Sequence, residues 1–272
     1  MIPKLRFVQI AFIGVCECLF LQVSGQKLSL STASDSALFY YYQGWEQVLD
    51  YGHFTNSESA YRDMYRHDPN LLVGVCLLAR ITQDPDERRK LIADVERDYD
   101  KVSGDEKMLL RLFLDLAKLY LLRETGQSDK IADHLDQTFT NGEKTLALLS
   151  RKYPQDIYYK SEYIEVLHRN YGAQKALDSL SRLFPEPPPF MQGYKSQLLS
   201  ELGRYESARE EADRLQEVLD IDQAPYVSMV YAKLHQEKGE IEVALEYVSK
   251  ALSIDPRHIL ALRLKEELAT TR

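Results

Sequence analysis

A small residue recurs at nearly constant spacing in the C-terminal half of the chain. Ala176, Ala208 and Ala244 are 32 and 36 residues apart, and each follows a short break in a stretch with helical periodicity. A small side chain at equivalent places in successive helices lets neighbouring helices approach closely, because a bulky one would push them apart. The spacing therefore predicts a stack of similar helical units rather than one compact core.

The clearest unit runs from Tyr226 to Pro256. Gly239 stands at its turn, Ala244 and Ala251 follow in its second helix, and Pro256 ends that helix. Glycine allows the left-handed conformation in which many helices end, and proline cannot continue a helix. This pattern resembles the tetratricopeptide repeat, a helix-turn-helix unit of about 34 residues.

The resemblance extends over most of residues 35–256, with its strongest motifs in the last third. It implies an all-α fold, a right-handed α-solenoid, within a single region at 35–272. A half-polar helix at 257–270 would cap the open end of the stack. The units are expected at about 35–69, 70–103, 105–152, 155–186, 189–222 and 225–258.

The helix boundaries follow from local start and stop signals. Asp84 and Pro85 form an N-cap followed by proline at the first helical position. Asn141-Gly142 looks like a turn, yet apolar residues recur every three or four positions across it, which predicts one long helix with a weak point at Gly142. We expect helices at about 36–50, 55–67, 71–82, 86–101, 105–124, 128–152, 156–170, 173–184, 190–202, 205–220, 225–238, 241–253 and 257–270.

The first residues have the pattern of an export signal. Lys4 lies in a short basic stretch before an apolar run that ends at Leu21, and small residues follow up to Gly25. We predict a signal peptide at 1–25, cleaved after Gly25, and a linker at 26–34. Retention as an uncleaved anchor is the alternative, although the run is shorter than the roughly 20 apolar residues of a membrane span. The protein is then exported, periplasmic or associated with the outer membrane, and contacts the membrane only transiently.

Composition argues against several classes of function. The formal net charge is −8, and no basic face stands out, so we expect no nucleic-acid partner. The six histidines are scattered without zinc-protease spacing, and no glycine-rich phosphate loop or nucleophile elbow occurs. We therefore expect no enzyme, no catalytic residue, no metal and no small-molecule cofactor. Cys76 lies in an apolar run and is predicted to be a buried hydrophobic residue.

Aromatic residues recur near the start of the first helix of several units. In arrays of this family, these positions and those three residues further on tend to face a concave groove, where aromatic side chains supply contact area. The alternative is that they pack against the preceding unit. The predicted groove-binding residues are Phe39, Tyr42, Tyr158, Phe190, Tyr226, Met229 and Lys233.

The resemblance implies that the groove binds a peptide or protein segment, because such arrays present it to another polypeptide. The basic and asparagine clamp that some arrays use for carboxylate ends of chaperones is missing here. Corresponding positions include Glu165, Gln197, Tyr226 and Val230. A groove bearing Glu46 and Glu165 favours a neutral or basic segment.

Three functions remain open at this point. The first is a non-enzymatic adaptor or scaffold of the cell envelope that binds another protein of unknown identity. The second is a structural subunit of an outer-membrane assembly or secretion complex. The third is an enzyme with a site in the aromatic stretch Leu38–Phe54, although this cluster is also expected to pack under the first unit. Within it, Trp45 is predicted to fill the gap left by an absent preceding repeat.

Overall fold

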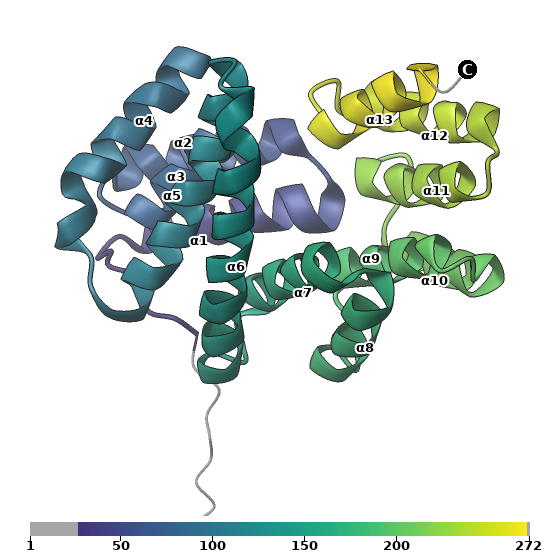
Figure 1. The fold of residues 1–272 in the computed structure, drawn as a ribbon, viewed down its shortest axis with the longest axis horizontal. Helices are drawn as coiled ribbons and strands as arrows, with labels where there is room; N and C mark the ends of the chain where they lie inside the picture. The colour runs from purple at the N-terminus through teal and green to yellow at the C-terminus, as the bar shows by residue number, and fades with distance from the viewer. Residues whose placement is uncertain (1–26, 271–272) are drawn as a thin grey trace, which may run out of the picture.

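The protein is all-α, as the sequence predicts. The computed structural model describes residues 27–270, in which every regular element is helical (Figure 1). The predicted signal peptide at 1–25 lies outside the described residues. Among the helices within 27–270, none combines the length and the apolar character needed to cross a membrane.

The observed helices match the predicted ranges to within two residues at each end, when two short irregular turns are counted. A π-helical turn, η1 (Gln47–Tyr51), extends the first helix, and a 3-10 turn, η2 (Tyr99–Lys101), follows the fourth. The α-helices are α1 (Asp35–Glu46), α2 (Phe54–His67), α3 (Leu72–Ile81), α4 (Pro85–Asp98), α5 (Gly104–Glu124), α6 (Ser128–Lys152), α7 (Ile157–Tyr171), α8 (Ala173–Leu183), α9 (Pro189–Glu201), α10 (Tyr205–Val218), α11 (Pro225–Glu237), α12 (Ile241–Ile254) and α13 (Ile259–Thr270).

The predicted start and stop signals act as expected. The carboxylate of Asp84 accepts hydrogen bonds from the backbone N–H groups of Asp86 and Glu87, at 2.9 and 3.2 Å. These bonds satisfy two of the free donors at the start of α4. Gly239 has a φ of +76° between α11 and α12, a conformation that favours glycine. Helix α6 continues through Gly142 without a break, as the apolar periodicity predicts.

The recurring alanines lie at helix contacts. Ala176, Ala208, Ala244 and Ala251 are all 0% exposed. Helix α9 packs against both α10 and α11, and α11 packs against α12, so neighbouring helix pairs are in direct contact. The hydroxyl of Ser196 donates to the carbonyl of Ala208 at 2.7 Å, which requires the backbones of α9 and α10 to lie close together. The prediction of close packing at these alanines is therefore confirmed.

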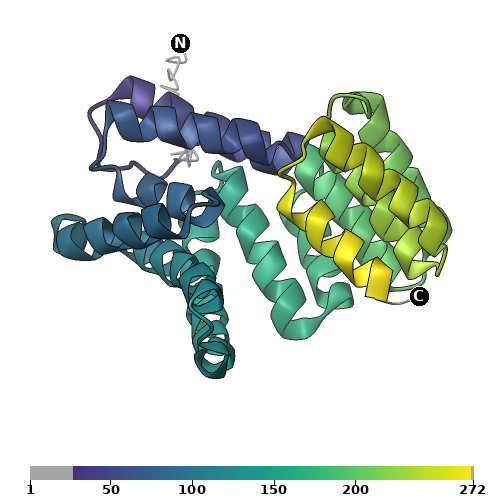
Figure 2. The same ribbon diagram turned by 90° about the horizontal axis from the view of Figure 1, so that it is seen from above.

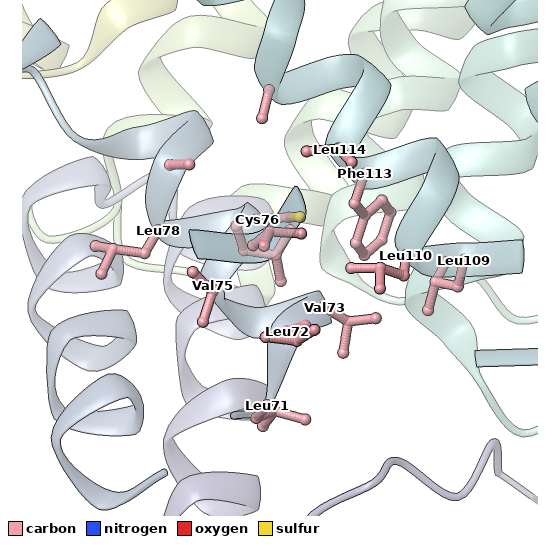
Figure 3. Packing of buried hydrophobic residues seen from close by; sticks show 14 of the residues in the cluster. Leu71, Leu72, Val73, Val75, Cys76, Leu78, Leu109, Leu110, Phe113 and Leu114 are labelled. Carbon is pink, nitrogen blue, oxygen red and sulfur yellow. The ribbon is translucent and has the colours of Figure 1, made fainter. Parts of the chain in front are cut away.

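The N-terminal half is built around α3, which is apolar nearly all round. Leu109, Leu110 and Phe113 of α5 pack against it (Figure 3). Cys76 lies inside this cluster, and burial raises the pKa of its thiol well above the usual range. The prediction that Cys76 is a buried hydrophobic residue is confirmed.

The segment before α1 is packed onto the helices. Leu28 and Leu30 are buried, and the backbone N–H of Leu28 donates to the carboxylate of Asp156. Burial raises the pKa of Asp156 to about 6, although that hydrogen bond opposes the shift. Residues 27–34, which lie in the predicted linker, therefore pack onto the helices and hold the N-terminal end of the fold in place.

The ends of the helical chain meet. In Figure 2, the hairpin of α1 and α2 reaches from the N-terminal helices to the green and yellow C-terminal helices, and η1 contacts both α9 and α11. The backbone N–H and hydroxyl of Thr55 donate to the carboxylate of Asp255, at 3.0 and 2.6 Å. Arg257 forms an ion pair with Glu58, and the rings of Phe54 and His258 lie 4.8 Å apart. We call this set of contacts the closure.

Candidate functional site

The closure borders a partly open cavity of about 210 Å³ between the α1–α2 hairpin and the start of α13. We call it the central cavity. Its walls come from helices far apart in the sequence, and they combine aromatic and aliphatic side chains with two arginines and two glutamates. Its lining residues are Trp45, Val48, Leu49, Phe54, Tyr61, Leu77, Arg80, Ile81, Tyr120, Glu162, Glu165, Ile259, Leu260 and Arg263.

A second cavity, of about 350 Å³, lies between α7, α9 and α11 on one side and α13 on the other. We call it the α13 cavity. It shares Glu165, Leu260 and Arg263 with the central cavity, so the two spaces adjoin. Its lining residues are Glu165, Tyr194, Gln197, Tyr226, Met229, Val230, Lys233, His258, Leu260, Arg263, Leu264 and Glu267.

Three predicted groove residues meet in the α13 cavity. Tyr226, Met229 and Lys233 are three and four residues apart, which places them along one face of α11. The ammonium group of Lys233 donates to the side-chain carbonyl of Gln236 at 2.8 Å. This face of α11 therefore offers an apolar floor with a cation at its far end.

Two other predicted residues, Tyr42 and Tyr158, belong to an aromatic cluster with Trp45, in which Tyr158 contacts both of the others. The rings of Trp45 and Tyr158 are stacked with centroids 5.5 Å apart, and Phe113 of α5 lies 5.8 Å from Trp45 on another side. The prediction that Trp45 fills the place of a missing preceding repeat is wrong, because its neighbours come from the later helices α5 and α7. Tyr42 is half-buried, with its ring 6.4 Å from that of Tyr158.

Phe190 packs against and hydrogen-bonds to other residues of the chain. Its ring lies 5.5 Å from that of Tyr226, and the hydroxyl of Tyr226 donates to its carbonyl at 2.7 Å. Its backbone N–H donates to the carboxylate of Asp50 in η1 at 3.1 Å. Burial raises the pKa of Asp50 to about 6, while this hydrogen bond opposes the shift. Phe190 thus joins α9 to the closure.

Phe39 stands apart from the other predicted residues. Its side chain is 61% exposed on α1, and its ring contacts that of the adjacent Tyr40 edge-on at 5.2 Å. It lines neither the central cavity nor the α13 cavity. The structure therefore brings Tyr226, Met229 and Lys233 into one site, and places Phe39, Tyr42, Tyr158 and Phe190 elsewhere.

The charges in the central cavity are arranged around Arg80 of α3. Its guanidinium lies 3.4 Å from the carboxylate of Glu162, which balances its charge. Glu165 lies one turn further along α7. Burial, reinforced by the neighbouring charge of Glu162, raises the pKa of Glu165 well above its usual range despite the opposing effect of Arg80.

The sequence pattern predicts only part of this site. The repeat spacing places Glu165 and Gln197 at groove positions, and both line the α13 cavity. It does not predict Arg80 or Arg263 as site residues. A lone arginine in the apolar stretch LVGVCLLARI was the available signal for Arg80, because an unpaired charge is rarely placed on a buried helix. Arg263 carried no such signal, because α13 was expected to be a solvated cap.

Comparisons with known proteins do not assign this chain. No protein-family model matches it, and no curated protein matches it either. Within residues 27–270, no group of three or more histidine, cysteine, aspartate or glutamate side chains is placed to hold a metal ion.

Proposed function

We propose that the protein is a non-enzymatic scaffold that binds a segment of another polypeptide, and that its helix pairs form a right-handed, tetratricopeptide-like α-solenoid with α13 as its last helix. The contact of α9 with α11 and the fully buried alanines of the helix pairs support the stacked arrangement. The N-terminal sequence supports export to the periplasm or outer membrane.

The observation that carries the proposal is the α13 cavity. Tyr226, Met229 and Lys233, chosen from the spacing of the repeats, converge on one space of about 350 Å³. Such a volume, with an apolar floor and a few polar groups at its edge, is typical of ligand sites. The chain's own η1 occupies the neighbouring surface of α9 and α11, so a partner segment would bind in the remaining space beside α13.

The alternative, a permanently bound subunit of an outer-membrane assembly or secretion complex, would be favoured by one continuous exposed apolar surface. Within the described residues, the large exposed apolar side chains belong to α1, α5, α6, α7, α10 and α13. They are Phe39, Met108, Leu148, Tyr171, Val218, Leu260 and Leu262. Because they are distributed over six helices, we favour the adaptor.

A peptide array incubated with the full-length chain tests the proposal. Peptides that bind should bind about 10-fold more weakly to Met229→Ala and Lys233→Ala, the loss expected for residues central to an interface. Lys175→Ala, on the exposed surface of α8, is the matched control and should bind like the wild type. An array without binders, or equal affinities for all four proteins, would contradict the proposal.

A further inference from the structure

Glu165 is the residue at which the internal spaces meet. It lines the central cavity, the α13 cavity and a void of about 80 Å³ beside α5 and α6. Among residues 27–270, no hydrogen bond or ion pair reaches its carboxyl group, and the side chain is half-buried. A carboxyl group that is partly removed from water without a partner is less favourable in its charged form, so Glu165 would gain from a cationic ligand.

Two aromatic residues of the central cavity have polar groups that lack a hydrogen-bond partner among the described residues. Trp45 and Tyr61 are each 2% exposed, and the indole N–H of Trp45 and the hydroxyl of Tyr61 have no hydrogen-bond partner among the described residues. Buried polar groups are normally hydrogen-bonded. The hydroxyl of Tyr61 is able to accept a hydrogen bond from a cation.

The charged side chains differ between the central cavity, which forms the deep end of the joined space, and the α13 cavity, which forms its mouth. At the deep end, Arg80 pairs with Glu162, and the carboxyl of Glu165 has no ion pair of its own among the described residues, although Arg263 also lines this cavity. At the mouth, Lys233 of α11 and Arg263 and Glu267 of α13 give one positive charge in excess, and His258 lies beside them. Burial lowers the pKa of His258 to about 4, so its imidazole is neutral near neutral pH. A suitable ligand therefore has a cation at its tip and acceptors such as carbonyl oxygens at its base.

We propose that Glu165 receives the ammonium group of a lysine side chain, which a partner polypeptide inserts through the α13 cavity. The inference rests on the proposed function and names the side chain that the partner supplies. The unbranched aliphatic part of a lysine side chain suits the apolar walls. Its compact ammonium group can bind a single carboxylate oxygen, whereas the planar guanidinium group of arginine is best matched by two oxygens. The carbonyl groups of the partner's backbone then face Lys233 and Arg263 at the mouth, where Leu260 is 54% exposed.

Binding of the ammonium group requires the ionised form of Glu165. Because its pKa is raised in the free protein, the carboxyl group releases a proton when the lysine binds. Affinity for lysine should therefore increase as the pH rises from about 6.5 to about 8, with release of about one proton per ligand at the lower pH. A neutral ligand in the same cavity would show neither effect.

Two blocked pentapeptides test the inference: Ac-Ala-Ala-Lys-Ala-Ala-NH2 and the same peptide acetylated on the lysine side chain. Calorimetric titration of the full-length chain near pH 8, with the NMR shift of the Met229 methyl group, should show the lysine peptide binding on the order of 10-fold more tightly, the value expected for a hydrogen bond to a charged group. Glu165→Gln should remove the difference. Glu266→Gln, an exposed carboxylate on α13, should retain it.

Each outcome decides the inference. Equal affinities for the two pentapeptides, or failure of both to shift Met229, would overturn it, while the scaffold function would stand if the array yields binders that depend on Met229 and Lys233. An array without binders would overturn both. A lysine preference that survives Glu165→Gln would assign the cation to another group. Melting temperatures of the variants near neutral pH show whether they fold.

Discussion

Replacement of Glu165 by glutamine should change how the stability of the protein depends on pH. Burial and the charge of Glu162 raise the pKa of Glu165 from 4.5 to about 8 in the folded chain. Between these values the folded state holds a proton that the unfolded state has lost. The contribution of Glu165 to stability is therefore fully present below about 4.5 and declines as the pH rises towards about 8.

The size of the effect follows from this pKa difference. The free energy of unfolding falls by at most ~1.4 kcal/mol per pH unit while the folded chain holds one extra proton. Integrated from pH 6.5 to 8, with half of the protons lost at the upper limit, the decline is about 1–2 kcal/mol. Glutamine keeps the shape of the protonated side chain and has no proton to lose. The Glu165→Gln variant should thus gain about 1–2 kcal/mol relative to the wild type over this range.

Urea unfolding of both proteins across this pH range measures the difference. Asp50, Asp156 and His258 also have shifted pKa values, but they titrate alike in both proteins, so their contributions cancel in the difference. Glu266→Gln removes an exposed carboxylate and should follow the wild type. Parallel curves for the wild type and Glu165→Gln would refute the reasoning that partial burial without a partner raises the pKa of Glu165.

Three substitutions test the packing by urea unfolding. Gly193→Ala should destabilise the protein by about 1–3 kcal/mol, because its Cβ would lie 2.7 Å from the ring of Tyr226. Gly142→Ala should instead stabilise it by up to about 1 kcal/mol, because the nearest atom, 3.0 Å away, is a methyl of Leu112, which borders an open groove, and alanine favours the helix; the reverse order would refute this account. Thr55→Val leaves the carboxylate of Asp255 without one donor and should cost about 1–3 kcal/mol, and an unchanged stability would show that the closure contributes little.

The helices were predictable because their signals are local. Asp84 caps the helix that begins at the next residue, and Gly239 ends one helix and starts the next within three residues. Apolar periodicity correctly outweighed the turn signal at Gly142, because α6 is packed along its length against α5 and α7. Each of these features depends on neighbours within about one or two helical turns.

The closure was beyond such reasoning. Thr55 and Asp255 are 200 residues apart in the sequence. Whether they meet depends on the packing angles between all the helices that lie between them, and small differences in these angles add up. The same limit explains the mixed result for the site. Tyr226, Met229 and Lys233 share one helix face, whereas Arg80 and Arg263 reach the cavities from helices whose placement depends on the closure. Phe190 has the same sequence signal as Tyr226, but η1 covers it.

The central cavity forms only when the closure forms, because its walls include both Phe54 of the α1–α2 hairpin and Leu260 of α13. A ligand that touches both walls must therefore stabilise the closed chain, by about 2.7 kcal/mol when present at 100 times its dissociation constant. Thermodynamic linkage is reciprocal: if the ligand favours the closed chain by a given factor, then a variant that opens the closure lowers the affinity for that ligand by up to the same factor. Thr55→Val should then weaken a lysine peptide that reaches Glu165, although Thr55 touches neither cavity. A peptide held only by Met229 and Lys233 of α11 would bind this variant unchanged, which separates deep insertion from binding at the mouth.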